Sequence, residues 1–445
     1  MLEFPKVMQL FQDIYYLNRV HNSDDFVKSL EIISQWIKVN GFRGRCRLIE
    51  YPAGAVYNYW RVPNRWKVHH FSLKNLAGEE VVSSATHPLT LTPFSDSFSG
   101  IVTKEELLNH VFTRKDLPDA IPFHFRKMYR HWENNWGIAL PYRIVKELKN
   151  SHYQVEIATE FQEKPMVVLE YTLSGRTDDI IHMAAHLDHP GQCNDSLSGV
   201  ISSLSVIKEI ESRFRDPKYT YSVLLCPEIV GSAVYLHNEP TISSNIKYCL
   251  CPNMVGHDAP IALCRDKLGD SLLSKALQLA LYSSKTEHVI GDWHKYPDCG
   301  DEISYDAPGI AIPTNTFSRV GEMYRYYHTS LDTPERISKV KFEEAVNVMA
   351  NALEYMEHNV VPKRNFIGNL SLASPELNLY LEPLNVSNQL NLAADTTLRN
   401  LETGSLIDSR NFQEYFLSNL EGSANLIDLA YEVRLPFDFV HSYAK

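Results

Sequence analysis

Strand-like and helix-like segments alternate along residues 165–358, and this alternation constrains the fold more than any other feature of the sequence. Short apolar runs such as MVVLEYTL, DIIHMAAHL and YSVLLCPE predict buried strands. Longer segments with helical spacing, such as DSLSGVISSLSVIKEIESRF and VKFEEAVNVMANALEYMEH, predict helices. Such a pattern is typical of an α/β domain in which helices sandwich a mostly parallel sheet. Ligands of these sheets bind beyond the carboxyl ends of the strands.

Further elements of the same pattern are the strand KYCLCPNMVG, the helix SLLSKALQLALYSS and the strand GIAIPTN. The first 40 residues predict two helices, with an Asn-Ser-Asp run as the cap of the second. Short alternating segments broken by Pro, Gly and Asn then predict a small β-rich domain. Its one helix signal is a capping box from Thr103 to Glu106. The sequence thus divides into an α/β domain (1–50 and 141–360), an inserted β-rich domain (51–140) and a C-terminal helical module (361–445).

Composition and charge exclude several classes of protein. Hydrophobic residues make up 44% of the 445 and charged residues 22%, as in ordinary globular proteins. The net charge of −11 and the scattered basic residues argue against a nucleic-acid surface. No apolar run approaches the roughly 20 residues that cross a bilayer, and no secretion signal begins the chain. Seven cysteines, none in a CxxC pair, predict buried thiols in a reducing compartment. We therefore expect a cytoplasmic protein that binds neither nucleic acid nor membranes.

The stretch HMAAHLDHPGQCNDSLSGV joins a predicted strand end to a predicted helix start. The strand ends at His186, and Asn194 and Asp195 then open the helix, where either could cap it. This spacing brings His186 and Asp195 together at the carboxyl edge of the sheet. An imidazole and a carboxylate are a pair suited to zinc. The alternative is a capping role for Asp195 and a core role for His186.

Other predicted strands also carry an acid or a histidine near the strand end. Glu228 ends the strand YSVLLCPE, although it could instead cap the following helix. Asp301 and Glu302 stand just before an apolar run, and His328 follows that run in the loop YRYYHTSLDTPERI. Because strand ends of a parallel sheet meet at one edge, these residues indicate a shared site.

At this point the sequence resembles a known family. The order H-x-D, then N-D, then a strand-end Glu before Gly-Ser, then H-T-S-x-D-T is similar to the zinc aminopeptidases and glutaminyl cyclases. The whole chain resembles a bacterial group of aminopeptidase-like proteins with an inserted β-rich domain, whose C-terminal helical module is often winged-helix-like. The motifs that carry this resemblance are W-x-V-P (Trp60, Val62, Pro63), H-x-x-H-P (His186, His189, Pro190), P-E-x-x-G-S (Pro227, Glu228, Gly231, Ser232), D-E (Asp301, Glu302) and Y-H-T-S (Tyr327 to Ser330).

The resemblance implies Zn²⁺ as a cofactor, with His186, Asp195 and His328 as its ligands. It also implies that Asp188, the second acid of H-x-D, orients His186 or steadies its charge. In the family an aspartate binds a second zinc ion, but Asn253 occupies the matching position here. A neutral amide is a poor zinc ligand, so we expect one tightly bound zinc ion.

Glu228 is the single acid at a position where true aminopeptidases have two, so it is either a ligand or the general base. If three other residues bind the metal, Glu228 is the base, because a catalytic zinc keeps one position open for water. If Glu228 is a ligand, Glu302 is the next candidate for proton transfer.

The resemblance also implies residues on the substrate side of the site. Arg265 matches an arginine that would meet a substrate carboxylate, and its alternative role is a surface ion pair. From their position beside His328, and not from the resemblance, Tyr327 or Tyr326 would donate to the oxyanion. Asp301 is also a candidate substrate-binding residue. Alternatively, Asp301 or Asp258 supplies the carboxylate that Asn253 lacks and so completes a second metal site.

These observations together predict a zinc-dependent amide hydrolase of the aminopeptidase type. Metal-bound water would attack an amide next to a free amino group in a small peptide or aminoacyl amide. Two alternatives remain: an acyl transferase of the glutaminyl cyclase kind, and a metal-free binding module.

Overall fold

The structure is a computed structural model that describes residues 2–293, 300–381 and 398–445. The chain forms two compact units, one of residues 1–267 and 289–346 and one of residues 268–288 and 347–445. The first unit holds two large sheets, whereas the described part of the second unit is mostly helical. None of the helices in the described ranges is long and apolar enough to cross a membrane.

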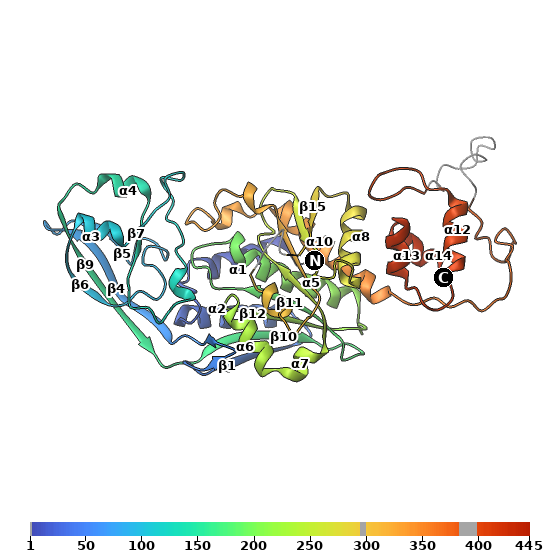
Figure 1. Ribbon diagram of the computed structural model, residues 1–445, viewed down its shortest axis with the longest axis horizontal. Helices are drawn as coiled ribbons and strands as arrows, with labels where there is room; N and C mark the ends of the chain where they lie inside the picture. The colour runs from blue at the N-terminus through green and yellow to red at the C-terminus, as the bar shows by residue number, and fades with distance from the viewer. Residues whose placement is uncertain (1, 294–299, 382–397) are drawn as a thin grey trace. The chain divides into compact units, whose positions relative to one another are not determined.

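A sheet of eight strands forms the centre of the first unit (Figure 1). In spatial order its strands are β1 (Arg45–Tyr51), β10 (Met166–Leu173), β12 (Thr220–Cys226), β11 (Ile180–His186), β13 (Ile246–Pro252), β16 (Thr314–Arg319), β14 (Ile261–Cys264) and β15 (His288–Gly291). The four central strands, β12, β11, β13 and β16, run parallel to one another. The outer strands β1, β10 and β14 pair in the antiparallel sense.

The central strands are buried on both faces, which explains their continuous apolar sequences. Every residue of β11 is buried, and so is every residue of β12 after Thr220. In the parallel register His186, the last residue of β11, lies beside Cys226, the last residue of β12. The carboxyl ends of these strands therefore form one edge of the sheet.

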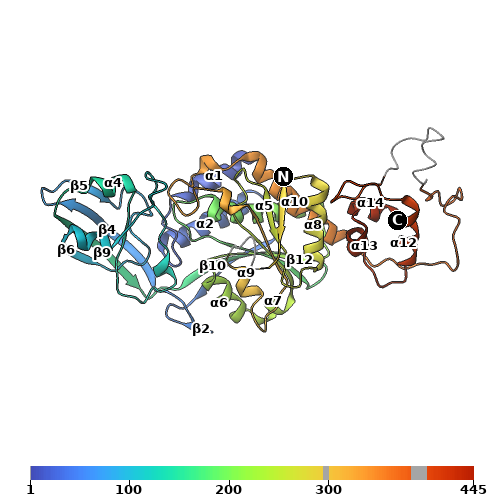
Figure 2. The same ribbon diagram turned by 45° about the horizontal axis from the view of Figure 1, so that its top comes forward.

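Helices cover both faces of this sheet (Figures 1 and 2). The helices α2 (Asp24–Val39) and α5 (Gly199–Arg213) lie on one face, and α1 (Phe4–Tyr15) packs against α2. The other face carries α6 (Val230–Asn238), α7 (Pro240–Asn245) and α9 (Glu302–Tyr305). Ser23 caps α2 by accepting the N–H of Phe26 at 3.0 Å, in the predicted capping run. The predicted α/β fold, a mostly parallel sheet between helices, is confirmed.

A second, antiparallel sheet also belongs to the first unit. Its strands in spatial order are β5 (Glu80–Ser83), β4 (Arg65–Asn75), β9 (His152–Gln162) and β6 (Phe98–Thr103). Around it lie the paired strands β7 (Val111–Phe112) and β8 (Ile138–Ala139) and the helices α3 (Lys104–Asn109) and α4 (Tyr142–Glu147). The paired strands β2 (Val56–Tyr57) and β3 (Trp60–Arg61) pack against α6 instead. Thr103 and Glu106 form the predicted capping box of α3. Because β9 pairs along β4 as far as Gln162, this sheet continues beyond the boundary predicted at residue 140. We call residues 51–162 the β-rich region.

The described part of the second unit contains α8 (Leu272–Ser284), α12 (Ser409–Ser418), α13 (Leu426–Val433) and α14 (Phe437–Tyr443), together with the end of α10 (Lys339–His358). Lys275 of α8 makes an ion pair with Asp428 of α13 at 2.7 Å. Tyr431 of α13 donates to Oε1 of Gln278 at 3.1 Å. These contacts group α8 with the C-terminal helices, although the sequence predicts α8 within the α/β domain. The winged-helix-like character of residues 361–445 stays a prediction, and residues 382–397 lie outside the described ranges.

Candidate metal centre and active site

His186, the last residue of β11, lies buried at the carboxyl edge of the large sheet. Its Nε2 atom lies 3.3 Å from Oδ1 of Asp195, and its Nδ1 atom lies 3.1 Å from Oδ2 of Asp301. A carboxylate on one ring nitrogen fixes the orientation of an imidazole and leaves the other nitrogen free to bind a metal ion. Thus β11 supplies this imidazole and Asp301 orients it.

Asp195 lies in the turn Asn194–Ser198 that leads into α5, and imidazoles surround its carboxylate. Its Oδ2 atom lies 2.9 Å from Nε2 of His328 and 3.6 Å from Nε2 of His189. Possible ligand atoms of His186, His189 and Asp195 all lie within 4.8 Å of one another. The structure therefore brings the three predicted ligand residues together and adds His189. We call these four residues the imidazole–carboxylate cluster.

Burial and close contacts shift the pKa values of the side chains in the cluster away from their ordinary values. Burial raises the pKa of Asp195, but the surrounding imidazoles outweigh burial and hold that pKa well below its usual range. Burial lowers the pKa of His186, yet its hydrogen bonds to Asp195 and Asp301 raise it well above the ordinary value. Burial lowers the pKa of His189 to about 3, so this ring is neutral at neutral pH. His189 and Asp195 are therefore in the forms that bind metals, whereas His186 would release its proton on binding one.

Two ring nitrogens of the cluster are buried without a hydrogen-bond partner among the described residues, Nδ1 of His189 and Nε2 of His328. Leaving a buried polar atom unpaired costs about 1–3 kcal/mol, so such atoms need an explanation. Nε2 of His328 faces the Asp195 carboxylate without hydrogen-bonding geometry, and a metal ion bound by both groups would remove this cost. Imidazoles and a carboxylate are also the donors that zinc prefers. The residues present therefore fit a zinc ion.

The buried carboxylate of Asp332 holds the backbone around Asp195. It accepts the N–H groups of Cys193 at 3.1 Å, Asn194 at 3.0 Å and Asp195 at 3.0 Å. The hydroxyl of Tyr324 donates to the same carboxylate at 2.6 Å. Because three consecutive N–H groups converge on one side chain, the turn before α5 has a fixed conformation and Asp195 a fixed direction.

Arg19 holds the loop that carries His189. This guanidinium is fully buried and donates to the carbonyl oxygens of Leu187, of His189 at 2.5 Å and of Gln192 at 3.2 Å. It also donates to the carbonyl of Ile14 at 3.0 Å, near the end of α1. One cation thus fixes the loop after β11 to the N-terminal helices.

The loop that carries His328 is paired with the β-rich region. The N–H of Phe123 donates to the carbonyl oxygen of His328 at 2.8 Å, and the N–H of Ser330 donates to that of Ile121 at 2.9 Å. The ring of Phe123 meets the imidazole of His328 edge-on, with centroids 5.4 Å apart. The β-rich region therefore positions one of the candidate ligands.

Glu228 follows the end of β12, as predicted, and is bound from two sides. Tyr129 of the β-rich region donates its hydroxyl to Oε2 of Glu228. The backbone N–H of Glu228 donates to Oδ1 of Asp188 at 2.8 Å. Burial raises the pKa of Glu228 to about 8, and the charge of Asp188 adds to this effect against the opposing influence of His186. A carboxyl group with a pKa near neutrality is suited to exchanging protons.

Gly300 leaves the space that the Glu228 side chain occupies. A Cβ atom at position 300 would overlap Oε1 of Glu228, and the φ angle of +94° also favours glycine. A side chain at this position would displace the carboxylate.

Asp188 makes no hydrogen bond to the His186 ring among the described contacts, so the predicted orienting role falls to other carboxylates, while its charge still acts on that imidazole. Its Oδ2 atom lies 2.9 Å from Nε2 of His21, and its Oδ1 atom accepts the N–H of Glu228. Hydrogen bonds to His186 in the described structure come from Asp195 and Asp301 instead. Asp188 thus fixes Glu228, because the chain turns after β11 and directs this side chain towards the end of β12.

The predicted substrate-binding role of Asp301 also does not fit its position. Asp301 is fully buried, and besides His186 it accepts the N–H of Ile229 at 2.9 Å and the hydroxyl of Ser232 at 2.8 Å. The start of α6 covers this carboxylate, so its partners are protein groups. Asp301 orients a candidate metal ligand instead.

The positions of three other predicted residues are known, but nothing in the structure tests their predicted roles. Glu302 begins α9 and is buried. Tyr327 stacks on the ring of His328, with centroids 3.9 Å apart, and is 42% exposed. Arg265 makes an ion pair with Asp292, which is the alternative that the sequence analysis left open.

Asn253 follows β13 and touches the cluster through its amide. Its Nδ2 atom donates to Oδ1 of Asp195 at 3.3 Å, while its Oδ1 atom accepts the N–H of Met254 at 2.8 Å. The second contact fixes which end of the amide faces Asp195. A donor therefore stands where the resemblance described above implies a metal-binding carboxylate.

Sequence reasoning missed three residues of this site. His189 stands in the quoted H-x-x-H-P motif, and its position three residues after His186 was the available signal. His21 and Tyr129 lie far from Asp188 and Glu228 in the sequence, and no motif links them. Only the folded chain brings these pairs together.

Comparisons with known proteins agree with this architecture. The chain is 24% identical over 433 residues to a Clostridium acetobutylicum protein provisionally named a polysaccharide biosynthesis protein with an aminopeptidase-like domain, covering 97% of this chain and 92% of that protein. The crystal structure of a provisionally named peptidase from Clostridium acetobutylicum matches 99% of this chain and 93% of its own, with a TM-score of 0.81 and 23% identity. BSAP, a zinc aminopeptidase from Bacillus subtilis, matches 79% of this chain and 94% of its own, with a TM-score of 0.58 and 13% identity.

At these identities the likeness shows the fold, which is that of the zinc aminopeptidases, as the motifs predicted. A family model described as a domain of unknown function, DUF4910, matches residues 8–359. That range contains both large sheets and the whole imidazole–carboxylate cluster. The chain therefore belongs to the DUF4910 family, whose member here has an aminopeptidase-like fold.

Proposed function

We propose that this protein is a zinc-dependent aminopeptidase that hydrolyses the amide next to a free amino group in a small peptide or aminoacyl amide. The observation that carries the proposal is the buried cluster in which the imidazoles of His186, His189 and His328 surround the carboxylate of Asp195. The fold shared with a zinc aminopeptidase from Bacillus subtilis supports the same reaction class.

The residues of the imidazole–carboxylate cluster would hold the zinc ion. A bound zinc ion supplies a Lewis acid that polarises the scissile carbonyl and lowers the pKa of water. Asp301 orients His186 and Asp332 fixes the backbone of Asp195, so the ligand side chains are pre-organised. Tyr327, stacked on His328, is the proposed donor to the oxyanion.

Glu228 is the proposed general base. It takes a proton from the attacking water and passes it to the departing amine. Burial raises the pKa of Glu228 to about 8, so its ionised form is a stronger base than an ordinary carboxylate, and its protonated form can pass the proton on close to neutral pH. The hydroxyl of Tyr129 and the carboxylate of Asp188 hold the side chain and the backbone of Glu228 during this transfer.

The proposed location is the cytoplasm. Cys193 and Cys226 are buried thiols outside any disulfide, and such thiols are typical of proteins in reducing compartments.

Metal analysis combined with an aminoacyl-anilide assay tests the proposed function. We expect about one tightly bound zinc ion per chain, anilide cleavage that a chelator abolishes, and recovery when zinc is added back. Acetylation of the substrate's amino group should abolish cleavage, which separates an aminopeptidase from a general amidase. A protein that retains zinc but cleaves no amide with water would contradict the proposal and favour an acyl transferase.

A further inference from the structure

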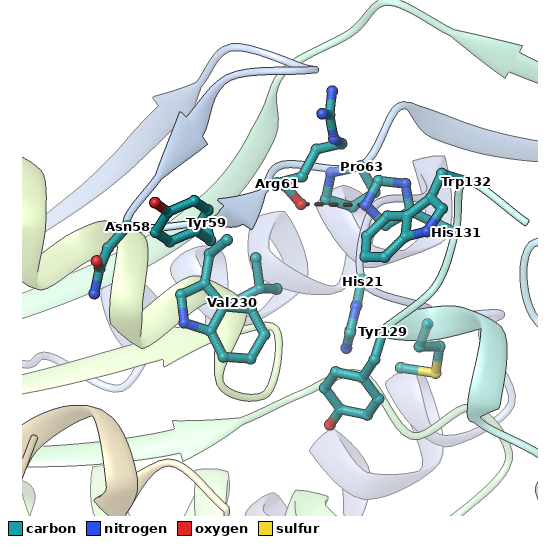
Figure 3. Close-up of a pocket in the computed structure, with 11 residues that line it drawn as sticks. His21, Asn58, Tyr59, Arg61, Pro63, Tyr129, His131, Trp132 and Val230 are labelled. Carbon is teal, nitrogen blue, oxygen red and sulfur yellow. Dashed lines mark hydrogen bonds between the residues drawn. The ribbon is translucent and has the colours of Figure 1, made fainter.

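A pocket of about 220 Å³ lies between the β-rich region, His21 and Val230 of α6, and Tyr129 of its lining contacts Glu228 (Figure 3). Aromatic rings from several separate segments form most of its lining (Figure 3). These rings belong to His21, Tyr59, Trp60, Tyr129, His131 and Trp132. Pockets that enclose whole ligands usually measure about 300–1,000 Å³, so this one suits a single side chain of a larger molecule.

Two lining residues join the pocket directly to the catalytic acids. Tyr129 donates its hydroxyl to Glu228, and His21 lies 2.9 Å from Asp188. The ring of Tyr129 meets that of His21 at 5.3 Å in an edge-on arrangement, so the two form one wall. Val230, two residues after Glu228, also lines the pocket. The pocket therefore adjoins the proposed base through the Tyr129 ring and through Val230.

The lining favours an uncharged guest. None of the described residues that line the pocket is an acid, so a cationic side chain would lack a counter-charge. Burial lowers the pKa of His131 to about 4, so its ring is neutral. The carbonyl oxygen of Arg61 lies 3.2 Å from Nε2 of His131. The guanidinium of Arg61 points away from the aromatic rings (Figure 3). A bound side chain would therefore contact the faces and edges of neutral rings, which suit aromatic and large aliphatic groups.

The W-x-V-P motif explains how one wall is held. Trp60 belongs to β3, and the next residues are anchored by the backbone: the N–H of Val62 donates to the carbonyl of Ala55 at 2.9 Å. The carbonyl of Pro63 accepts the amide of Asn22 at 2.9 Å. On the other side Trp132 is 60% exposed, which leaves its indole accessible to a bound group.

We propose that this aromatic pocket binds the side chain of the substrate residue that carries the free amino group, and that it selects large uncharged side chains, aromatic ones above all. The inference rests on the proposed aminopeptidase function and adds its specificity. Trp60 and Trp132 are the specificity-determining residues, and neither takes part in proton transfer.

The test compares the zinc-loaded full-length enzyme with its Trp132→Ala variant on the 4-nitroanilides of alanine, leucine, phenylalanine and lysine. We expect wild-type kcat/KM for phenylalanine to exceed that for alanine by on the order of a hundredfold. Trp132→Ala should lower this ratio about tenfold, the size of a lost aromatic contact. Trp132→Glu should shift the preference towards lysine, because it adds the missing counter-charge.

Tyr380→Ala provides the matched control, since Tyr380 is an aromatic residue 44% exposed in the second unit. It should leave every ratio unchanged. Equal activity on alanine and phenylalanine, a wild-type preference for lysine, or an unchanged ratio in both Trp132→Ala and Trp60→Ala would overturn the proposal.

A second measurement separates failure of the pocket from failure of the proposed function. If the wild type cleaves none of the anilides, the proposed aminopeptidase function is wrong. The pocket is then tested by ligand binding alone. Tryptophan fluorescence is then followed during titration with phenylalanine amide and alanine amide. Saturable quenching by phenylalanine amide alone, lost in Trp132→Ala, supports the pocket, and identical responses to both amides overturn it.

Discussion

The carboxyl edge of the large sheet and the β-rich region meet at the candidate active site, and they contribute different kinds of side chain. The sheet edge contributes buried ionisable groups such as His186, Asp195 and Asp301, each bound by other fixed groups. The β-rich region contributes aromatic residues such as Tyr129 and Trp132, which lie outside its regular strands.

This difference separates reaction chemistry from recognition. Bond cleavage needs charges held in one geometry, and strand ends in a packed sheet provide it. Recognition needs a surface that can vary in shape, and irregular segments tolerate such variation better than strands. Changes at Trp60 and Trp132 should therefore alter the choice of substrate, whereas changes at the sheet edge should abolish the reaction.

Removal of one candidate metal-binding imidazole should have the largest effect on the proposed reaction. His186→Ala or His328→Ala should lower bound zinc well below one ion per chain and abolish activity, because few ligands hold the metal. Metal analysis after dialysis and the anilide assay check both effects. His69→Ala, at a half-exposed position on β4, is the control and should change neither quantity. Unchanged zinc content in both variants would contradict the metal site described here.

Glu228→Gln should separate metal binding from proton transfer at the sheet edge. We expect unchanged zinc content and circular dichroism, with turnover lower by on the order of a hundredfold or more, as for loss of a general base. Zinc content and kcat are measured on the same preparation. Loss of zinc would instead identify Glu228 as a ligand and transfer the base role to Glu302.

Tyr129→Phe should measure what the β-rich region adds to the chemistry. The variant removes the hydroxyl that Glu228 accepts, and a lost hydrogen bond to a charged group, worth about 1.5 kcal/mol or more, should lower kcat about tenfold. Zinc content should not change. Tyr59→Phe, at a 95% exposed position on the same pocket, is the matched control. Wild-type kcat in Tyr129→Phe would show that the sheet edge positions Glu228 without help.

The smallest expected effect concerns a second metal ion. Wild-type protein should bind one zinc ion tightly and a second weakly or not at all, since Asn253 presents a donor to Asp195. Asn253→Asp should create or strengthen a second site without changing the first, because it restores a carboxylate. Zinc titration measures both affinities. Two tight sites in the wild type that persist in Asp258→Asn would contradict this expectation.

The sequence was informative where the geometry is local. His186 and Asp195 are nine residues apart, and a strand end followed by a helix start fixes their proximity in any parallel sheet. Burial of both faces of β11 and β12 likewise produces an apolar run that predicts a strand.

The sequence was misleading where an apolar run is not a strand. GIAIPTN predicts a strand over residues 309–315, but β16 spans Thr314–Arg319, and Ile310 is 41% exposed after a turn at Gly309 with φ +86°. Polar residues such as Thr314 and Asn315 form the strand instead, because pairing with β13 buries them. Apolar pattern alone cannot identify a strand whose burial depends on its neighbours.

The sequence was silent where partners are distant. Tyr129 and Glu228 are 99 positions apart, and no spacing rule joins them. The roles of Asp188 and Asp301 could not be distinguished either, since each is an acid close to a strand end and only the turns decide which one faces His186.

The guanidinium of Arg19 has a consequence for the folding thermodynamics of the whole site. It joins the N-terminal segment to a loop 168 residues away at Leu187, the loop from which His189 reaches Asp195. Metal binding at His189 and docking of the N-terminal helices are therefore linked equilibria. Each must stabilise the other by the same free energy. Depletion of the metal would loosen the first two helices and open them to proteases, although neither helix contributes a ligand.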